Sequence, residues 1–129
     1  MNYKCRVNFL SGDEESKKRE RRTILLDAIS FTDAEAKLTE VFEGYEDFSV
    51  KSINQYKNSE MLTTGEGEKF FEGRVMQLIE KKKVNINFLV ETDSIDGALS
   101  IIERFVKENT FQNWIVKSLK QSDIEEVSL

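Results

Sequence analysis

One motif occurs twice in the sequence, as FSVKSI at residues 48–53 and as WIVKSL at residues 114–119. A second pair of matching segments lies upstream of these motifs, with YKCRV at residues 3–7 and FEGRV at residues 71–75. Two long copies, rather than many short ones, are not the pattern of a solenoid. The repetition therefore predicts a duplicated small unit with an approximate internal two-fold.

Length and composition favour one folded domain. The chain has 129 residues, which suits a single domain of ordinary size. Hydrophobic residues make up 39% of it and nine residues are Phe, so a packed core is expected rather than disorder. We expect one domain, residues 1–129, made of two similar halves at 1–62 and 68–129 that a short polar link at 63–67 joins.

Period-two alternation of apolar and polar residues indicates strands in both halves. The clearest case is Val84 to Val90, where every second residue is apolar. Residues 11–21 are expected to form a polar loop, and residues 123–126 a polar tail or a short helical turn. The expected strands cover about residues 2–10, 22–29, 47–55, 69–79, 83–91 and 114–119.

One helix is expected in each half, between the second and third strands. Thr32 has the side chain of an N-cap, and Glu35 three residues later would complete a capping box. Asp93 or Ser94 is expected to cap the second helix. The sequence thus predicts an α+β fold: a duplicated ββαβ unit, with six mainly antiparallel strands and two helices packed on one side.

The second expected strand is apolar on both faces, since Ile24, Leu25 and Leu26 follow one another. A strand with two apolar faces needs a second covering layer besides the helix. A homodimer would provide one, so we expect the chain to form a homodimer.

Composition excludes several classes of function. The chain has no His, which removes Ser-His-Asp triads, Cys-His dyads and His-bearing zinc sites together. Its single Cys, Cys5, falls on an apolar strand face and is interpreted as a core residue. Asp27, Asp33 and Glu35 are interpreted as strand-end and helix-cap residues rather than a cation site. We expect no enzymatic activity and no cofactor.

The location of the protein follows from what its sequence lacks. It contains no run of about 18 apolar residues that would span a membrane. The segment from Met1 to Cys5 has no apolar signal-peptide core, and a lone Cys suits a reducing compartment. We expect a cytoplasmic protein that does not bind membranes.

Two segments of the sequence are familiar, LDAISFTDAEA at residues 26–36 and GEKFFEGRV at residues 67–75. They resemble a small family from bacteria and their phages, which is catalogued as domain of unknown function family 4494. The resemblance extends over nearly the whole chain. It implies a phage or mobile-element setting, and it implies no activity.

Basic residues concentrate in short stretches although the net charge is −5. Clustered Lys and Arg on an acidic chain favour a local anion-binding patch. The candidate nucleic-acid or anion-binding residues are Lys4, Arg6, Lys17, Lys18, Arg19, Arg21, Arg22, Arg74, Lys81, Lys82 and Lys83. The candidates for stacking on bases are Tyr45, Tyr56, Phe70 and Phe111.

These residues leave more than one function open. The first is a non-enzymatic binding protein of phage or mobile-element type that binds single-stranded nucleic acid through basic hairpins on a sheet. The alternative is an accessory factor that interacts with a host protein, or that sequesters a small anion or nucleotide. Steep salt dependence is expected for the first function, and an exposed apolar patch for protein binding.

Overall fold

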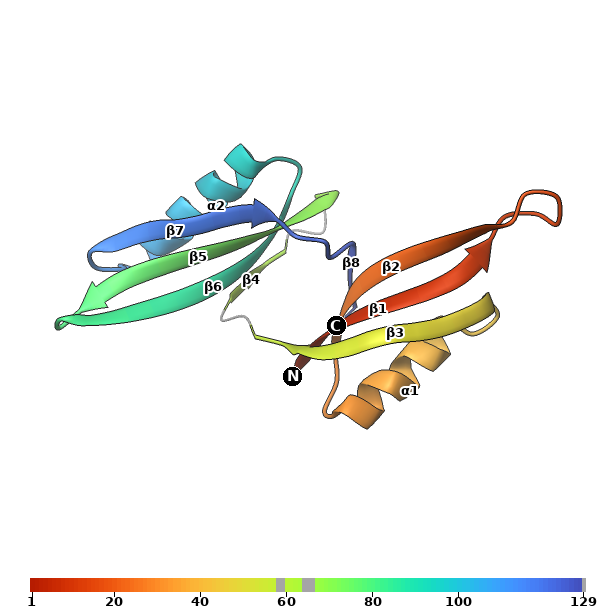
Figure 1. Cartoon of the computed structure of the whole chain (residues 1–129). Coiled ribbons are helices and arrows are strands. Elements are labelled where there is room, and N and C mark those ends of the chain that lie inside the picture. Colours follow the sequence, from red (N-terminus) through yellow and green to blue (C-terminus); the bar gives the residue numbers. More distant parts are fainter. Residues whose placement is uncertain (58–59, 64–66, 129) are drawn as a thin grey trace. The chain divides into compact units, whose positions relative to one another are not determined.

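The computed structural model describes residues 1–57, 60–63 and 67–128 of the chain. Over these residues the fold is α+β, with two helices and eight strands in two mixed sheets (Figure 1). The chain divides into two compact units. Unit 1 combines Met1–Tyr56 with Ile124–Leu129, and unit 2 is Lys57–Asp123.

Unit 1 contains one helix and a four-stranded sheet with the order β3-β1-β2-β8. The central strand β1 pairs antiparallel with both β2 and β3, whereas β8 pairs parallel with β2. The helix α1 covers one face of this sheet (Figure 1). The elements are β1 (Asn2–Ser11), β2 (Lys18–Asp27), α1 (Phe31–Val41), β3 (Glu46–Tyr56) and β8 (Glu126–Ser128).

Unit 2 has the corresponding order, β4-β6-β5-β7. Here β5 is the central antiparallel strand and the short strand β4 pairs parallel with β6. The helix α2 packs on one face of this second sheet (Figure 1). The elements are β4 (Glu60–Leu62), β5 (Lys69–Ile79), β6 (Lys82–Thr92), α2 (Ile95–Glu108) and β7 (Trp114–Gln121).

Each unit has its own hydrophobic core between its sheet and its helix. In unit 1 the alternate residues of β1 that face α1, among them Cys5, Val7 and Phe9, are buried against Leu38 and neighbouring helix residues. In unit 2 the corresponding core contains Phe88 and Ile102. Period-two alternation thus places one apolar face of each central strand under a helix, as the sequence predicted.

A β-bulge occurs at the matching place in both units. In unit 1 the pairing of β1 with β3 shifts between Arg6 and Val7, which leaves Lys51 as the extra residue. In unit 2 the pairing of β5 with β7 shifts between Arg74 and Val75, which leaves Lys117 as the extra residue. A bulge bends the strand and redirects its side chains, so each unit presents one lysine of the repeated motif in the same irregular position.

The number of strands was predicted wrongly, because eight strands are present over the described residues instead of six. The two additional strands, β4 and β8, have three residues each. Residues 123–126 were expected to form a tail or helical turn, but Glu126 begins β8 beside Ile24. Strands this short carry no readable periodicity, and their pairing depends on partners far away in the sequence.

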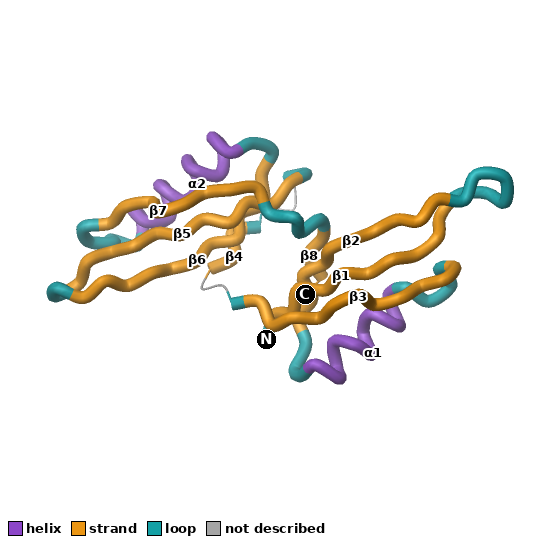
Figure 2. The backbone as a smooth tube through the Cα atoms, in the orientation of Figure 1, coloured by secondary structure: helices purple, strands orange, loops and turns teal. Residues whose placement is uncertain are grey.

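The hairpin between β1 and β2 is shorter than expected. Residues 11–21 were predicted to be a loop, but β1 continues to Ser11 and β2 begins at Lys18. Most of the basic stretch therefore lies in a strand. The first half of β2 is polar on both faces, so no hydrophobic alternation marks it. Figure 2 shows the remaining loop of this hairpin and the much tighter turn between β5 and β6.

The first helix cap was also misplaced, by two residues. The N-cap of α1 is Ser30, not Thr32, and the Ser30 hydroxyl accepts a hydrogen bond from the Asp33 backbone N–H at 3.1 Å. The Asp33 carboxylate accepts a second one from the Ile29 N–H at 3.0 Å, so Asp33 takes the role that was given to Glu35. In α2 the predicted cap Ser94 is confirmed.

The three consecutive apolar residues of β2 are all buried within the single chain. Leu25 points away from α1, yet its exposed fraction is 0%. The second apolar face that suggested a homodimer therefore needs no partner chain to be covered. The homodimer stays a prediction.

Candidate functional site

The sheet face of unit 1 opposite α1 is rich in cationic side chains. On β1, Lys4, Arg6 and Asn8 alternate with the core residues and so point to this face. On β2, Arg21 pairs with Asn8 and Thr23 pairs with Arg6, which places both on the same face. We call this surface the cationic face and define it by Lys4, Arg6, Asn8, Arg21, Thr23 and Lys51.

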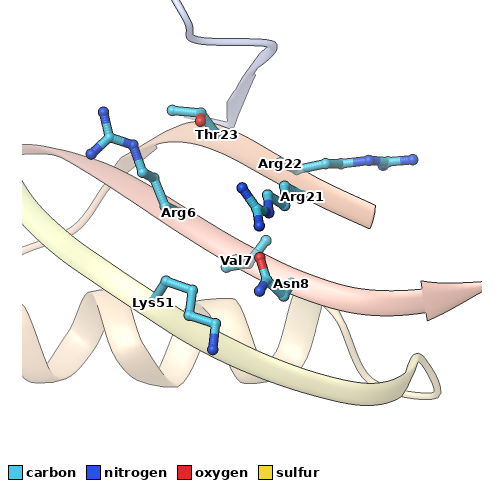
Figure 3. A pocket seen from close by; sticks show the side chains of 7 residues that line it. All are labelled: Arg6, Val7, Asn8, Arg21, Arg22, Thr23 and Lys51. Carbon is cyan, nitrogen blue, oxygen red and sulfur yellow. The ribbon is translucent and has the colours of Figure 1, made fainter. Parts of the chain in front are cut away.

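A hollow of about 390 Å³ lies on the cationic face (Figure 3). Figure 3 shows the Arg21 guanidinium beside the Asn8 amide, and the Lys51 side chain lying along β3. The Arg6 side chain extends away from Asn8 along the sheet. The residues that line the hollow are Arg6, Val7, Asn8, Arg21, Arg22, Thr23 and Lys51.

Asn8 is a buried polar residue at this site. Its exposed fraction is 8%, and its side-chain amide makes no hydrogen bond to any other residue in the described part of the chain. The amide atoms are nevertheless in reach of solvent, because Ser52 Oγ is the buried side-chain polar atom that lacks a partner in the described ranges. The Asn8 amide can therefore exchange contacts with water for contacts with a polar ligand.

Two cations beside Asn8 also lack protein partners. Neither Arg21 nor Lys51 has a carboxylate within ion-pair distance among residues 1–57, 60–63 and 67–128. Both are exposed, so their charges are available to an anion from solvent. The sequence singled out Arg21 but not Lys51 or Asn8.

Other predicted residues of unit 1 are engaged elsewhere. Lys17 pairs with Glu46 at 2.8 Å, and Arg19 pairs with Asp47. These two ion pairs connect the loop end of the β1–β2 hairpin to the start of β3.

Arg22 lies on the helix side of β2, and its guanidinium carbon sits 5.2 Å from the centre of the Phe9 ring. Its nitrogen is also 3.6 Å from a Glu20 carboxylate oxygen. Lys18 is exposed at the start of β2, where it pairs with Ser11.

The predicted basic residues of unit 2 form no comparable set. Arg74 donates a hydrogen bond to the Asn87 side-chain oxygen at 3.1 Å. Lys81 occupies a two-residue turn with Glu80, in which both residues have positive φ, as a type I′ hairpin turn requires. Lys82 and Lys83 belong to β6, so the turn itself consists of Glu80 and Lys81.

The matching face of unit 2 has a different character. Strand register places Glu72 where unit 1 has Lys4, Met76 where it has Asn8, and Asn85 where it has Arg21. Glu72 accepts a hydrogen bond from the Ser122 hydroxyl at 2.9 Å. Only Arg74 and Lys117 repeat the cations of unit 1.

The expected base-stacking aromatics differ in exposure, since Phe70 is buried whereas Tyr45 is 44% exposed. The Tyr45 ring packs against Phe9, with ring centroids 4.7 Å apart. Phe70 is buried, and Phe111 packs edge-on against Phe105 at 6.1 Å. Tyr56 lies on the same side of the sheet as the cationic face, because it pairs with Asn2, which alternates with the core residues as Lys4 and Arg6 do. It is therefore a stacking candidate at the Asn2 end of β1, whereas the hollow around Asn8 is lined by no aromatic residue.

A signal for Lys51 was present in the repeated motif. The apolar residues of the first copy are Phe48, Val50 and Ile53, so their spacing changes from two to three. A break in period two within a strand indicates a bulge, and the extra residue falls between the last two apolar positions. Asn8 carried no such signal, because its place beside Arg21 depends on the register between β1 and β2.

Among the described residues no three Cys, Asp or Glu side chains form a group able to hold a metal ion. Burial of the Cys5 side chain raises the pKa of its thiol to about 11, so it stays protonated at neutral pH. The Ile29 N–H bond lowers the pKa of Asp33, as its capping role requires. No helix in the described ranges is long and apolar enough to cross a membrane.

Comparison with known families shows to which protein family the chain belongs. A family model described as domain of unknown function (DUF4494) matches residues 1–128. The chain belongs to the DUF4494 family. This confirms the resemblance of residues 26–36 and 67–75. No curated protein and no solved structure matches the chain, so the DUF4494 assignment brings no ligand with it and the site is argued from its own geometry.

Proposed function

We propose that this DUF4494 protein is a non-enzymatic binding protein that binds single-stranded nucleic acid through its phosphates, on the cationic face of unit 1. The observation that carries the proposal is that Arg21, Lys51 and the Asn8 amide line one hollow. The two cations come from different strands and have no carboxylate partner in the described ranges. Guanidinium and ammonium groups beside an amide donor are suited to phosphate oxygens.

The spacing along β1 supports contact with a chain of phosphates rather than one ion. Lys4, Arg6 and Asn8 are successive outward residues, so each is about 6.6 Å from the next. That separation is of the same order as the distance between successive phosphates in an extended single strand. A strand laid along β1 would meet a donor at each phosphate.

The electrostatic setting limits contact to this face. The chain carries a net charge of −5, so most of its surface repels a polyanion. The hollow around Asn8 is lined by no aromatic residue, and Tyr56 lies at the other end of β1, so recognition would act mainly on the backbone and tolerate any base sequence. Binding of this kind depends steeply on salt concentration.

A second candidate function is capture of a small anion such as a nucleotide. The hollow favours it, because about 390 Å³ falls within the usual range for small-ligand sites, about 300–1,000 Å³. This candidate predicts weak dependence on salt, because few counterions are released. The same alternative includes an accessory protein of phage type that interacts with a host protein.

We also infer that units 1 and 2 arose by duplication of a ββαβ element. The bulges at Lys51 and Lys117 and the matched strand orders support this origin. The phage or mobile-element setting and the cytoplasmic location stay predictions.

The test is fluorescence anisotropy with a labelled single-stranded DNA of about 20 bases at two salt concentrations. The logarithm of affinity is expected to fall with the logarithm of salt by about 0.7 for each phosphate contacted. Arg21→Ala is expected to weaken binding about tenfold, as loss of one charge-assisted hydrogen bond does. Arg74→Ala removes an arginine from the corresponding sheet face of unit 2, at the position that matches Arg6, and is the control, with an expected change below about twofold on the same scale. Absence of binding at low salt would overturn the proposal.

A further inference from the structure

We infer that the Asn8 end of the cationic face seats a terminal phosphate of the bound strand, a phosphomonoester, rather than an internal phosphodiester. This inference rests on the proposed function and adds the part of the strand that the site recognises. Three features carry it: the number of donors around Asn8, the direction of the cationic path, and the charges beyond Asn8.

Donors are concentrated at one end of the path. Lys4 and Arg6 each supply one cation along β1, and both already interact within the protein. At Asn8 the donors are the Arg21 guanidinium, the Lys51 ammonium and the Asn8 amide. A phosphodiester has one negative charge and two terminal oxygens. A phosphomonoester has three terminal oxygens and a charge of about −1.5 to −2 at neutral pH.

The hydrogen-bond donors around Asn8 match a phosphomonoester better than a phosphodiester. Arg21 presents two parallel N–H groups to two oxygens, and Lys51 contributes a compact charge to the third. The Asn8 amide adds a neutral N–H donor that makes no hydrogen bond within the described part of the chain. An internal phosphate would leave part of this set unused.

The path cannot continue favourably past Asn8. The next outward residue of β1 is Leu10, which pairs with Glu46 of β3 and with Arg19 of β2. Glu46 and Asp47 are held there by ion pairs to Lys17 and Arg19. These pairs neutralise the hairpin end, so no net positive charge remains to attract a further phosphate. The strand is expected to end at Asn8.

The experiment compares three labelled oligonucleotides of identical sequence, with a 5′-phosphate, a 3′-phosphate or hydroxyl groups at both ends, and the label placed internally. One phosphorylated form is expected to bind about tenfold more tightly than the hydroxyl form, the effect of one additional charge-assisted contact. The end that gives the preference fixes the polarity of the strand on β1.

Variants locate the preference. Asn8→Leu removes the amide while keeping a side chain of similar size, and it is expected to bring the ratio between phosphorylated and hydroxyl forms close to one. Arg21→Ala is expected to do the same and to weaken both forms. Lys117→Ala, at the matching bulge of unit 2, is the control and should keep the ratio. Circular dichroism of each variant separates loss of the site from loss of the fold.

The outcomes distinguish the inference from the function on which it rests. Equal affinity for all three oligonucleotides would overturn the terminal-phosphate inference and leave strand binding in place. No binding of any form would overturn the proposed function itself. A preference that survives both Asn8→Leu and Arg21→Ala would show that the terminal phosphate lies elsewhere, and would also overturn the inference.

Discussion

Units 1 and 2 share strand order, strand register and bulge position, yet they present different outer faces. In unit 1 that face carries Lys4, Arg6 and Arg21 around a buried Asn8. In unit 2 the positions matching Lys4 and Asn8 hold Glu72 and Met76. The backbone is constrained by the core on the helix side, whereas the residues on the opposite side are free to differ. The comparison shows that the same scaffold need not carry the same site.

The cores differ as well, at one matching position. The residue of β1 that pairs with Ile24 is Cys5, and the residue of β5 that pairs with Phe88 is Gly73. A Cβ atom at Gly73 would lie 2.6 Å from the Ile102 Cδ1 atom of α2. In unit 2 the Ile102 side chain of α2 therefore occupies the space that the Cys5 side chain of β1 occupies in unit 1.

The largest expected effect tests whether the cores of units 1 and 2 contribute equally to the stability of the fold. Phe88 and Phe9 are both buried, each with an exposed fraction of 1%. Phe88→Ala is expected to lower the free energy of unfolding by about 3–5 kcal/mol, as truncation of a core Phe does. Urea denaturation measures the change, with Phe9→Ala as the partner variant in unit 1. A cost near zero for Phe88→Ala would contradict the assignment of β6 to the core.

The next effect tests whether the outer faces of units 1 and 2 differ in their affinity for single-stranded DNA. Lys51→Glu places a negative charge beside Asn8 and Arg21, so affinity for single-stranded DNA is expected to fall about 100-fold, or about 2.7 kcal/mol. Lys117→Glu makes the same change at the same bulge position of unit 2. It is expected to alter affinity less than about threefold. Equal losses in anisotropy titrations would show that both units bind.

A smaller effect concerns the core position that differs. Gly73→Ala introduces the crowded Cβ atom, and overpacking of this kind costs about 1–3 kcal/mol. Thermal unfolding followed by circular dichroism would detect it as a lower melting temperature. The reciprocal variant, Cys5→Ala, only removes a sulfur atom from unit 1. If Gly73→Ala left stability unchanged, the Ile102 side chain would have room to move away.

The smallest effect is expected at the β5–β6 turn. Replacing Lys81, Lys82 and Lys83 by Glu changes three exposed charges without touching the core. The fold is expected to stay intact, with a change in unfolding free energy within about 0.5 kcal/mol for each surface position. Unfolding of this variant in the same melting experiment would mean that the turn stabilises unit 2 through its lysines.

Much of the fold could be predicted from sequence because its long strands are covered on one side only. Tyr3 to Phe9 and Val84 to Val90 alternate cleanly, and Ser94 has a cap's side chain and position. The short strands β4 and β8 could not be predicted in this way. Three residues show no period, and parallel pairing with a distant strand leaves no local trace.

The site was only partly accessible to sequence reasoning. Counting basic residues selected Arg6 and Arg21, but it could not separate them from Arg19 and Arg22. Arg19 pairs with Asp47, which lies 28 positions further along the chain, and Arg22 faces Phe9. Which cation stays available depends on cross-strand partners, and those are fixed only by register.

The position of β8 in unit 1 has a consequence for synthesis of the chain on the ribosome. The strand β2 emerges early, but the residues that pair with Ile24 to Leu26 follow about 100 positions later, after all of unit 2. At translation rates of about 5–20 residues per second, that edge waits roughly 5–20 s for its partner. During this interval three apolar residues lie on an open strand edge in the nascent protein. A chaperone, or another nascent chain, would therefore be expected to bind unit 1 at this unpaired edge of β2.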